Sequence, residues 1–324
     1  MAAAILRRFG WALILLLVVL SGAFALLEAL PGDAAAVFED PRVPPAQHER
    51  LRAVYGLDRP APERFIRFLA AAVRGDWGYS FAFHRPVSEV LGAALPWTLT
   101  LALAALALEF GLGVPLGLWA ARRAGSATDH VLRAGALAIW TLPSFWLGLL
   151  LLLVFAFDWR LLPPGGVGSP GAESWPLAAR GLDLLRHLAL PAAALGLPAA
   201  AATARFVRAS LLEVAGEGFL LAARARGLAP RRVVWVHALR AAASPVLQLF
   251  GLSLAALLSG SLAVEVVFGW PGLGRVTYEA LAARDQPVLL AGATLAAATV
   301  LAGSLVAELA HLALDPRVRR GRES

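Results

Sequence analysis

Six long apolar runs follow one another along the chain, and shorter polar or arginine-containing segments separate them. Each run reaches the roughly 20 residues that an α-helix needs to cross the hydrocarbon core of a bilayer. The runs extend over about 9–30, 97–121, 131–157, 188–212, 241–268 and 288–314. The pattern therefore predicts an all-α polytopic membrane protein with six transmembrane helices.

Prolines predict irregularities inside two of these spans. Pro143 predicts a kink in the third span, and Pro191 and Pro198 predict interruptions of the fourth, because proline removes a backbone hydrogen bond. Asp129 and His130 are expected in a short loop before the third span. The segment that follows this span, LLPPGGVGSPGAESWP, is expected to lack regular structure because of its proline and glycine content.

The first span, within residues 1–30, is expected to stay in the mature protein. Two arginines precede its apolar run, and Ala23-Phe24-Ala25 resembles a signal-peptidase site, so cleavage is the alternative. The apolar run continues past this site to Leu30, which favours a retained helix with its N-terminus inside.

Residues 31–96 are polar, rich in proline and too numerous for a turn between two spans. PPAQHERLRAVYG predicts a helix that begins near Pro45 and ends at Gly56, and PERFIRFLAAAVRG predicts a second helix with an apolar face. The turn-rich stretch GDWGYSF follows. We expect a small helical element outside the membrane, between the first two spans.

The distribution of arginine sets the expected orientation. Six spans place both termini on one side of the membrane, and sixteen of the 29 arginines fall on that side although its loops are shorter. Because short cytoplasmic loops carry the excess of basic residues, both termini and the segment 213–240 are expected in the cytoplasm.

The composition fits a membrane protein and excludes several chemistries. Hydrophobic residues make up 59% of the chain, charged residues 16%, and the mean hydropathy is +0.69. Cysteine is absent, which excludes disulfides and thiolate metal sites. Lysine is also absent, so the chain lacks a residue that a standard nucleotide-binding P-loop requires. We attribute the net charge of +7 to cytoplasmic loops rather than to nucleic-acid binding.

The segment 213–240 is the longest strongly basic stretch between two apolar runs. Glu217 suits a helix N-terminus, where its charge favours the helix dipole. The short helix that follows is expected to end at Gly227, since glycine takes the left-handed conformation after a helix without steric cost, and Pro230 suits the first turn of the next helix. The segment is thus expected to lie across the end of the bundle. A helix held to anionic lipid by its arginines is the alternative.

Four motifs between residues 31 and 319 carry a resemblance to a known family. LAARARGLAPRRVVWVHALRAAASPV resembles the cytoplasmic coupling loop of ABC-importer permeases of the dipeptide, oligopeptide and nickel branch. FGWPGLGRVTYEAL followed by RDQPV is similar to that branch's stretch between its last two spans, LDPRVR resembles its C-terminal signature, and LPGD resembles its first external loop. The resemblance covers nearly the whole chain and makes residues 97–324 the permease core.

The resemblance implies a membrane subunit with no bond chemistry and no cofactor of its own. It implies a second homologous permease subunit, two cytoplasmic ATPase subunits that bind ATP and magnesium, and an extracytoplasmic substrate-binding protein for which residues 31–96 form part of the docking surface. Membrane lipid is expected as a partner, and nucleic acid is not. The residues implied in coupling to the ATPase are Glu217, Phe219, Leu221, Ala222, Ala223, Arg224, Arg226 and Gly227.

This chain departs from the general permease motif at two positions. A Glu heads the coupling loop in that motif and a Pro closes it, whereas Leu221 and Arg240 stand at those places here. The ending HALR is typical of the peptide branch, so the departure is interpreted as a feature of that branch.

Two carboxylates inside the spans are candidates for the translocation path. Glu265 matches an acidic position of the family, although a snorkelling or capped structural carboxylate is the alternative. Glu109 lies deep in the second span, where carboxylates usually mark a pathway or a buried pair. GWPGLG is interpreted as an external turn, because neither the strand nor the helix start of a nucleotide loop is expected beside it. The histidines are isolated, so no metal site is predicted.

Two other classes of membrane protein fit the sequence less well. A secondary transporter is expected to show an internal repeat, and none is evident. An intramembrane hydrolase needs a base beside its nucleophile, and Ser144, Ser253 and Ser259 have no histidine at a suitable spacing. The predicted function is therefore the path of an ATP-driven importer for peptides, with nickel chelates, glutathione-like compounds and oligosaccharides as alternative substrates.

Overall fold

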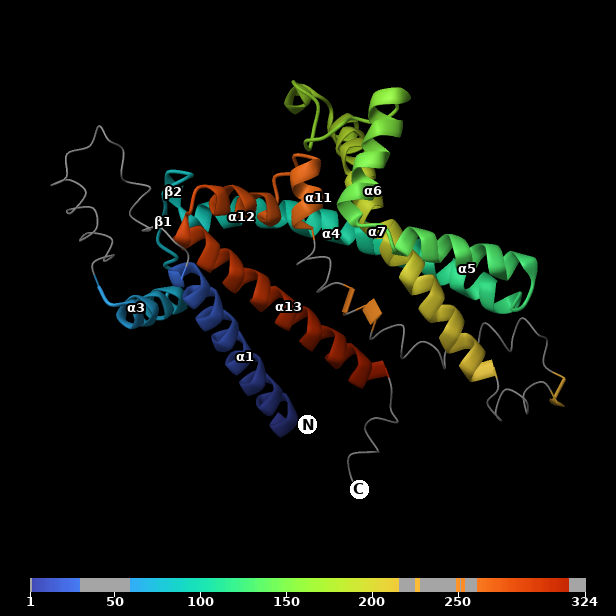
Figure 1. Ribbon diagram of the computed structural model, residues 1–324, viewed down its shortest axis with the longest axis horizontal. Helices are drawn as coiled ribbons and strands as arrows, with labels where there is room; N and C mark the ends of the chain where they lie inside the picture. The colour runs from blue at the N-terminus through green and yellow to red at the C-terminus, as the bar shows by residue number, and fades with distance from the viewer. Residues whose placement is uncertain are drawn as a thin grey trace. The chain divides into compact units, whose positions relative to one another are not determined.

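The computed structural model describes residues 2–29, 59–215, 225–227, 249–250, 252–253 and 261–314. This part of the chain is predominantly helical, as predicted, with one two-stranded antiparallel sheet (Figure 1). Its elements are α1 (Ala2–Ala29), α3 (Ala61–Val73), β1 (Tyr79–Ser80), β2 (Arg85–Pro86), α4 (Val87–Arg122), α5 (Ala127–Trp140), α6 (Ser144–Leu151), a π-helix (Leu152–Asp158), a 3-10 helix (Ala172–Ser174), α7 (Leu177–Ala215), α11 (Leu262–Val267), α12 (Leu273–Ala282) and α13 (Gln286–Leu314).

Four of the described helices are long and apolar enough to cross a membrane, namely α1, α4, α7 and α13. The bent pair α5–α6 makes a fifth if it forms one span. The predicted fifth span, 241–268, lies mostly outside the described residues. The described part of the chain therefore carries four or five candidate spans.

Proline does not end or interrupt the long helices. α4 begins at Val87 rather than near Trp97, and Pro96 lies inside it. α7 is continuous with Pro191 and Pro198 in its interior, so the predicted interruptions of the fourth span are wrong. In an apolar environment the backbone retains its helical hydrogen bonds wherever it can, and neighbouring helices accommodate the few groups that proline leaves unpaired.

The third predicted span is broken rather than kinked. α5 ends at Trp140 and α6 begins after Pro143, and the two helices are bent by 100°. Asp129 and His130, which were expected in a loop, lie in the first turn of α5. The helix begins this early because Ser126 caps it, accepting a hydrogen bond from the Asp129 backbone N–H at 3.3 Å.

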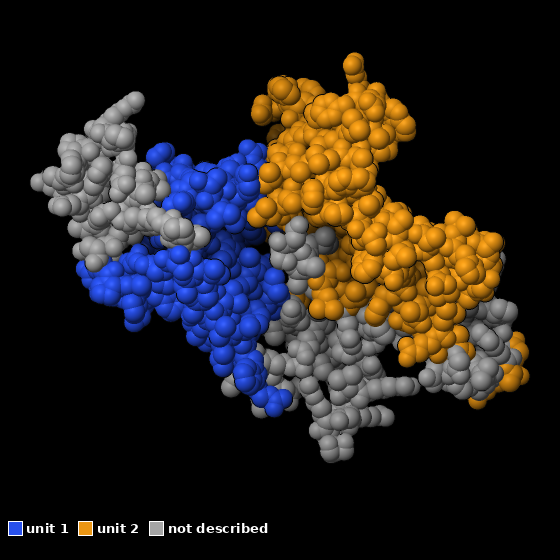
Figure 2. All heavy atoms as spheres, viewed as in Figure 1, with its two compact units in different colours: residues 1–98, 271–301 blue, residues 99–270, 302–324 orange. Residues whose placement is uncertain are grey.

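The chain forms two compact units, which Figure 2 distinguishes by colour. Unit 1 comprises residues 1–98 and 271–301, and unit 2 comprises residues 99–270 and 302–324. In unit 1, the predicted second external helix is present as α3, and Arg64 of α3 forms an ion pair with Glu28 of α1. The buried core of unit 1 joins α4, α12 and α13 through Val87, Leu91, Ala280, Val288, Leu289 and Ala291.

Asp285 fixes both the start of α13 and the β1–β2 hairpin in unit 1. Its side chain is fully buried and accepts hydrogen bonds from Ser80 Oγ at 2.6 Å and from the Ala82 N–H at 3.0 Å. It also accepts from the Val288 N–H at 3.4 Å, which is the contact of a helix N-cap. Asp285 of the RDQPV motif therefore has a structural role, because it caps α13 and holds the β1–β2 hairpin.

α4 and α7 pack closely and run parallel in unit 2. Gly196 of α7 lies against Ala105 of α4, and Gly117 of α4 lies against Ala204 and Val207 of α7. A Cβ atom at Gly117 would lie 2.5 Å from the Ala204 carbonyl oxygen, so a larger residue requires the helices to separate. Small residues of this kind allow membrane helices to approach one another closely.

The loop between α6 and α7 is largely irregular, as predicted, but it is anchored at two points. The Gly166 N–H donates to the Phe268 carbonyl at 2.9 Å. Asp183 of α7 accepts from the Ser169 N–H at 2.7 Å and from Ser169 Oγ at 2.8 Å. GWPGLG, in contrast, leads directly into α12 at Leu273, so the expectation that no helix begins there is wrong.

Candidate functional site

Glu109 lies where α4, α7 and the described residues 249–250 and 252–253 meet in unit 2. The residue is 1% exposed, and its Oε1 accepts hydrogen bonds from Thr203 Oγ at 2.6 Å and from Ser253 Oγ at 2.7 Å. Its Oε2 is buried without a hydrogen-bond partner among the described residues. Beside it, the rings of Phe110 and Phe250 lie 5.2 Å apart. Glu109 is therefore buried inside unit 2, and its role in a translocation path stays a prediction.

Glu265 lies in the first turn of α11 and is fully buried. Its Oε1 accepts a hydrogen bond from Ser261 Oγ at 2.8 Å. A snorkelling side chain reaches water, so this alternative for Glu265 is wrong. The position near a helix N-terminus favours its negative charge and agrees with a capped structural carboxylate.

The coupling segment is described only at its predicted turn. Gly227 has a φ of +76°, which confirms the predicted left-handed conformation, and Arg226 beside it is exposed. A Cβ atom at Gly227 would meet nothing within 4 Å, so the backbone conformation and not a lack of space selects glycine. The other residues implied in coupling lie outside the described residues; they are Glu217, Phe219, Leu221, Ala222, Ala223 and Arg224.

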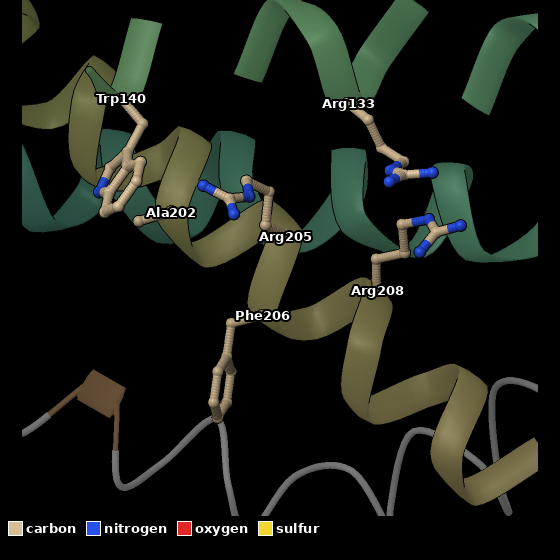
Figure 3. Close-up of a pocket in the computed structure, with 6 residues that line it drawn as sticks. All are labelled: Arg133, Trp140, Ala202, Arg205, Phe206 and Arg208. Atoms are coloured by element: carbon tan, nitrogen blue, oxygen red, sulfur yellow. The ribbon is translucent and has the colours of Figure 1, made fainter. Parts of the chain in front are cut away.

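The structure brings together a group of basic and aromatic residues that the sequence analysis did not single out. Arg133 and Trp140 of α5 and Arg205, Phe206 and Arg208 of α7 line a cavity of about 460 Å³ (Figure 3). The Arg205 guanidinium lies over the Trp140 ring, 4.8 Å from its centroid. The sequence signal that could have revealed this group is the pair Arg205 and Arg208, one helical turn apart inside a predicted apolar span.

The structure assigns no metal site to the residues it describes. Among them, no group of three or more His, Asp or Glu side chains could hold a metal ion. His187 is buried in α7, with its Nδ1 2.8 Å from the Asp183 carbonyl oxygen, which accounts for it as a structural residue.

Comparison with known proteins gives the family. Residues 113–320 match the family described as the binding-protein-dependent transport system inner membrane component, and residues 1–102 match the N-terminal component of such membrane proteins. The chain belongs to this family.

Similar proteins cover nearly the full length of this permease. The oligopeptide transport system permease protein AppB of Bacillus subtilis (strain 168) is 34% identical over 98% of this chain and 99% of its own. The dipeptide transport system permease protein DppB of Escherichia coli (strain K12) is 33% identical over 97% of this chain and 98% of its own. The inward-facing MetNI methionine ABC transporter supports the fold, with a TM-score of 0.56, 18% identity and coverage of 70% of this chain and 97% of that chain.

Family membership and the apolar helices together place the permease as a multi-pass protein of a bacterial inner membrane. As the membrane component of a binding-protein-dependent system, it works with a binding protein and with ATPase partners. The ATPase activity lies in those partner subunits, and the permease itself is not an enzyme.

Proposed function

We propose that this permease forms, together with a second homologous subunit, the translocation path of an ATP-driven peptide importer. The observation that carries the proposal is the full-length similarity to permeases named for oligopeptide and dipeptide transport. This similarity covers 97–98% of the chain and so includes the external element, the spans and the coupling segment.

The proposed topology has six spans with both termini in the cytoplasm. The parallel packing of α4 and α7 supports it, because two parallel spans require the chain between them to cross the membrane once more. The bent α5–α6 pair supplies that crossing. The remaining span, fifth in chain order, is then 241–268, and the arginine bias places the segment 213–240 inside.

Residues 31–96 are proposed as an external docking surface for the binding protein. The described part of this segment supports the proposal with a charged, accessible helix, α3, on which Arg67 is exposed and after which Arg74 is exposed. A hydrogen bond from Arg59 lowers the pKa of Glu63 on the same helix, so this carboxylate stays ionised at neutral pH. A surface with fixed charges of both signs suits the reversible docking of a soluble partner.

Coupling to two cytoplasmic ATPases is assigned to the segment 213–240. A left-handed turn at Gly227 supports it, since a sharp end to a short helix gives a compact element for a partner to hold. Phe219, Ala222 and Ala223 are proposed to pack into the ATPase, with Arg224 and Arg226 at the rim. Closure of the ATPases on ATP and magnesium then shifts the permease toward its outward-facing state by differential binding.

Glu109 and Glu265 are the carboxylates proposed to border the path. Support is stronger for Glu109, because its Oε2 is buried and unpaired among the described residues and it joins three segments of unit 2. Movement of Ser253 away from α4 would uncover this carboxylate. The buried position of Glu265 beside Ser261 makes a supporting role the simpler one.

The test is reconstitution of the permease with its partner permease, ATPases and binding protein in proteoliposomes. We expect uptake of labelled peptide that requires both ATP on the ATPase side and the binding protein. Mass spectrometry of the ligand that copurifies with the binding protein identifies the substrate class, and a nickel chelate, glutathione-like compound or oligosaccharide there would replace peptide. Uptake driven by an ion gradient without ATP would contradict the importer itself.

A further inference from the structure

Three arginines line the cavity between α5 and α7, and only one of them is paired with a carboxylate of the described residues. Arg208 forms two hydrogen bonds of 2.7 Å with the Asp129 carboxylate, so its charge is compensated. Arg133 and Arg205 form no ion pair with the residues that the structure describes. Figure 3 shows the guanidinium groups of Arg133 and Arg208 facing one another at one end of the cavity. Three guanidinium groups beside one carboxylate favour an anion.

An apolar groove of about 320 Å³ shares the same arginines. α4, α5 and α7 all contribute to it, and its lining is almost entirely hydrocarbon. The side chains that line it include Leu112, Leu116, Val131, Leu132, Ile139 and Leu197. A basic mouth that opens into an apolar groove matches a molecule with an anionic head and a hydrocarbon tail.

The three arginines lie near the helix ends that are proposed to be cytoplasmic. At 1.5 Å per residue, Arg208 and Arg205 are about 10 Å and about 15 Å from the end of α7 at Ala215, and Arg133 is about 9 Å from the start of α5. α7, with 39 residues, is about 58 Å long and exceeds the roughly 45 Å of a bilayer with its headgroups. The arginines can therefore lie at the level of the headgroups.

We propose that this cavity and groove bind one anionic phospholipid, with its phosphate at the cluster of Arg133, Arg205 and Arg208 and one acyl chain in the groove. The surroundings favour lipid over a soluble partner, because Val131, Leu137 and Trp140 on α5 are exposed large apolar side chains. Basic pockets between membrane helices on the cytoplasmic side are suited to acidic headgroups. Trp140 adds an aromatic surface beside the arginines.

Selectivity for an anionic headgroup is measured on the permease after purification with its partner subunits and removal of lipid by detergent. Native mass spectrometry measures the retention of phosphatidylglycerol and phosphatidylcholine added at equal concentration. We expect the wild type to retain phosphatidylglycerol preferentially, and Arg133→Gln and Arg205→Gln to weaken that binding about fivefold each and about thirtyfold together. The matched control is Arg180→Gln with Arg186→Gln, which removes the same charge from exposed positions at the other end of α7 and should change nothing.

The binding of the acyl chain in the groove is tested by substitution of a glycine that has room for a side chain. Gly135 lines the groove, and a Cβ atom there would meet nothing within 4 Å, so Gly135→Leu should fold normally while occupying the space of the acyl chain. We expect this variant to lose phosphatidylglycerol although all arginines remain. Gly181→Leu, at another open position on α7, should retain it.

Three results would overturn the proposal. The first is equal retention of phosphatidylglycerol and phosphatidylcholine by the wild type, and the second is equal loss in the Arg180 and Arg186 control. The third is crosslinking of a photoreactive residue at Trp140 to a partner subunit instead of to lipid, which would assign the cavity to a protein interface. Equal melting temperatures for all variants confirm that the comparison concerns binding and not folding.

Discussion

Arg208 of α7 forms a bidentate ion pair with Asp129 of α5, with Nε–Oδ1 and Nη2–Oδ2 distances of 2.7 Å each. The planar guanidinium fixes both the distance and the orientation of the two helices. Oδ2 also accepts a hydrogen bond from the Gly125 N–H at 3.0 Å. One carboxylate thus ties the α4–α5 loop, the start of α5 and α7 together.

This relationship predicts coupled mutational effects. Asp129→Asn leaves Arg208 without its counter-ion, and Arg208→Gln leaves Asp129 with only its local hydrogen bonds, so each variant should lower the melting temperature of the purified permease. The double variant should lose less stability than the two single effects added together. Thermal unfolding in one detergent measures all four proteins. Strictly additive effects would show that the pair contributes no coupling.

A second prediction concerns the contact between α4 and α7. Gly117→Ala introduces a Cβ atom 2.5 Å from the Ala204 carbonyl oxygen and should destabilise the permease by about 1–3 kcal/mol through overpacking. Gly111→Ala on the same helix is the matched control, because a Cβ atom there meets nothing within 4 Å. This control should be neutral or stabilising by up to about 1 kcal/mol, since alanine favours a helix. Unfolding in mixed micelles with increasing SDS measures both, and equal effects would contradict the proposed close packing.

The apolar runs predict four spans that the described residues contain as α1, α4, α7 and α13, because the bilayer imposes a length on any helix that crosses it. Two corrections have separate physical causes. Pro191 and Pro198 do not interrupt α7, since an apolar environment offers an interrupted backbone no water to replace its hydrogen bonds. The charged stretch at Asp129 resembles a loop in the sequence, yet the cap at Ser126 makes it the first turn of a helix.

The surroundings of the buried carboxylates could not be predicted from the sequence. Glu109 is 94 residues from Thr203 and 144 residues from Ser253, and no local pattern connects them. Gly227 is the opposite case, because the end of a short helix is decided by its own neighbours and glycine is the residue that takes a positive φ without cost. The conformation of Gly227 was therefore predictable from its own neighbours, whereas contacts between spans were not.

A third prediction concerns topology and uses the absence of cysteine from the chain. Val73→Cys lies at the end of α3 at a residue that is 90% exposed, and Arg226→Cys lies at the exposed coupling turn. In cells whose outer membrane is permeabilised and whose inner membrane is intact, a membrane-impermeant maleimide should label position 73 and leave position 226 unlabelled. Inverted vesicles should give the opposite result. Labelling of both positions from one side would contradict the proposed six-span arrangement.

A fourth prediction separates a path role from a structural role for Glu109. Glu109→Gln keeps the shape and an acceptor oxygen for Thr203 and Ser253, so stability and subunit assembly should be unchanged. The variant removes the negative charge, and peptide uptake should therefore fall by about tenfold if the carboxylate borders the path. Thr203→Val is the control, since it removes one donor and keeps the charge. Normal uptake by Glu109→Gln would assign the residue to packing alone.

The last prediction concerns Gly227, where backbone conformation can be varied without steric conflict. Its φ is +76° and a Cβ atom would meet nothing within 4 Å, so substitutions there change the conformational cost and little else. Asparagine tolerates the left-handed region, most other residues lose about 1–2 kcal/mol in it, and the β-branched valine is the least compatible. Stimulated ATP hydrolysis and peptide uptake should therefore fall in the order Gly227→Asn, Gly227→Ala, Gly227→Val.

The matched control is Gly125 in the loop between α4 and α5. It has a φ of +81° and open space around its Cβ position, so Gly125→Ala carries the same backbone cost at another loop. Such a cost is too small to unfold the permease, and expression and binding-protein association should stay nearly intact in both series. If Gly125→Ala uncouples ATP hydrolysis from uptake as strongly as Gly227→Ala, the effect reflects general loop strain. If Gly227→Val transports at the wild-type rate, the segment 213–240 is not the element that transmits ATPase closure to the spans.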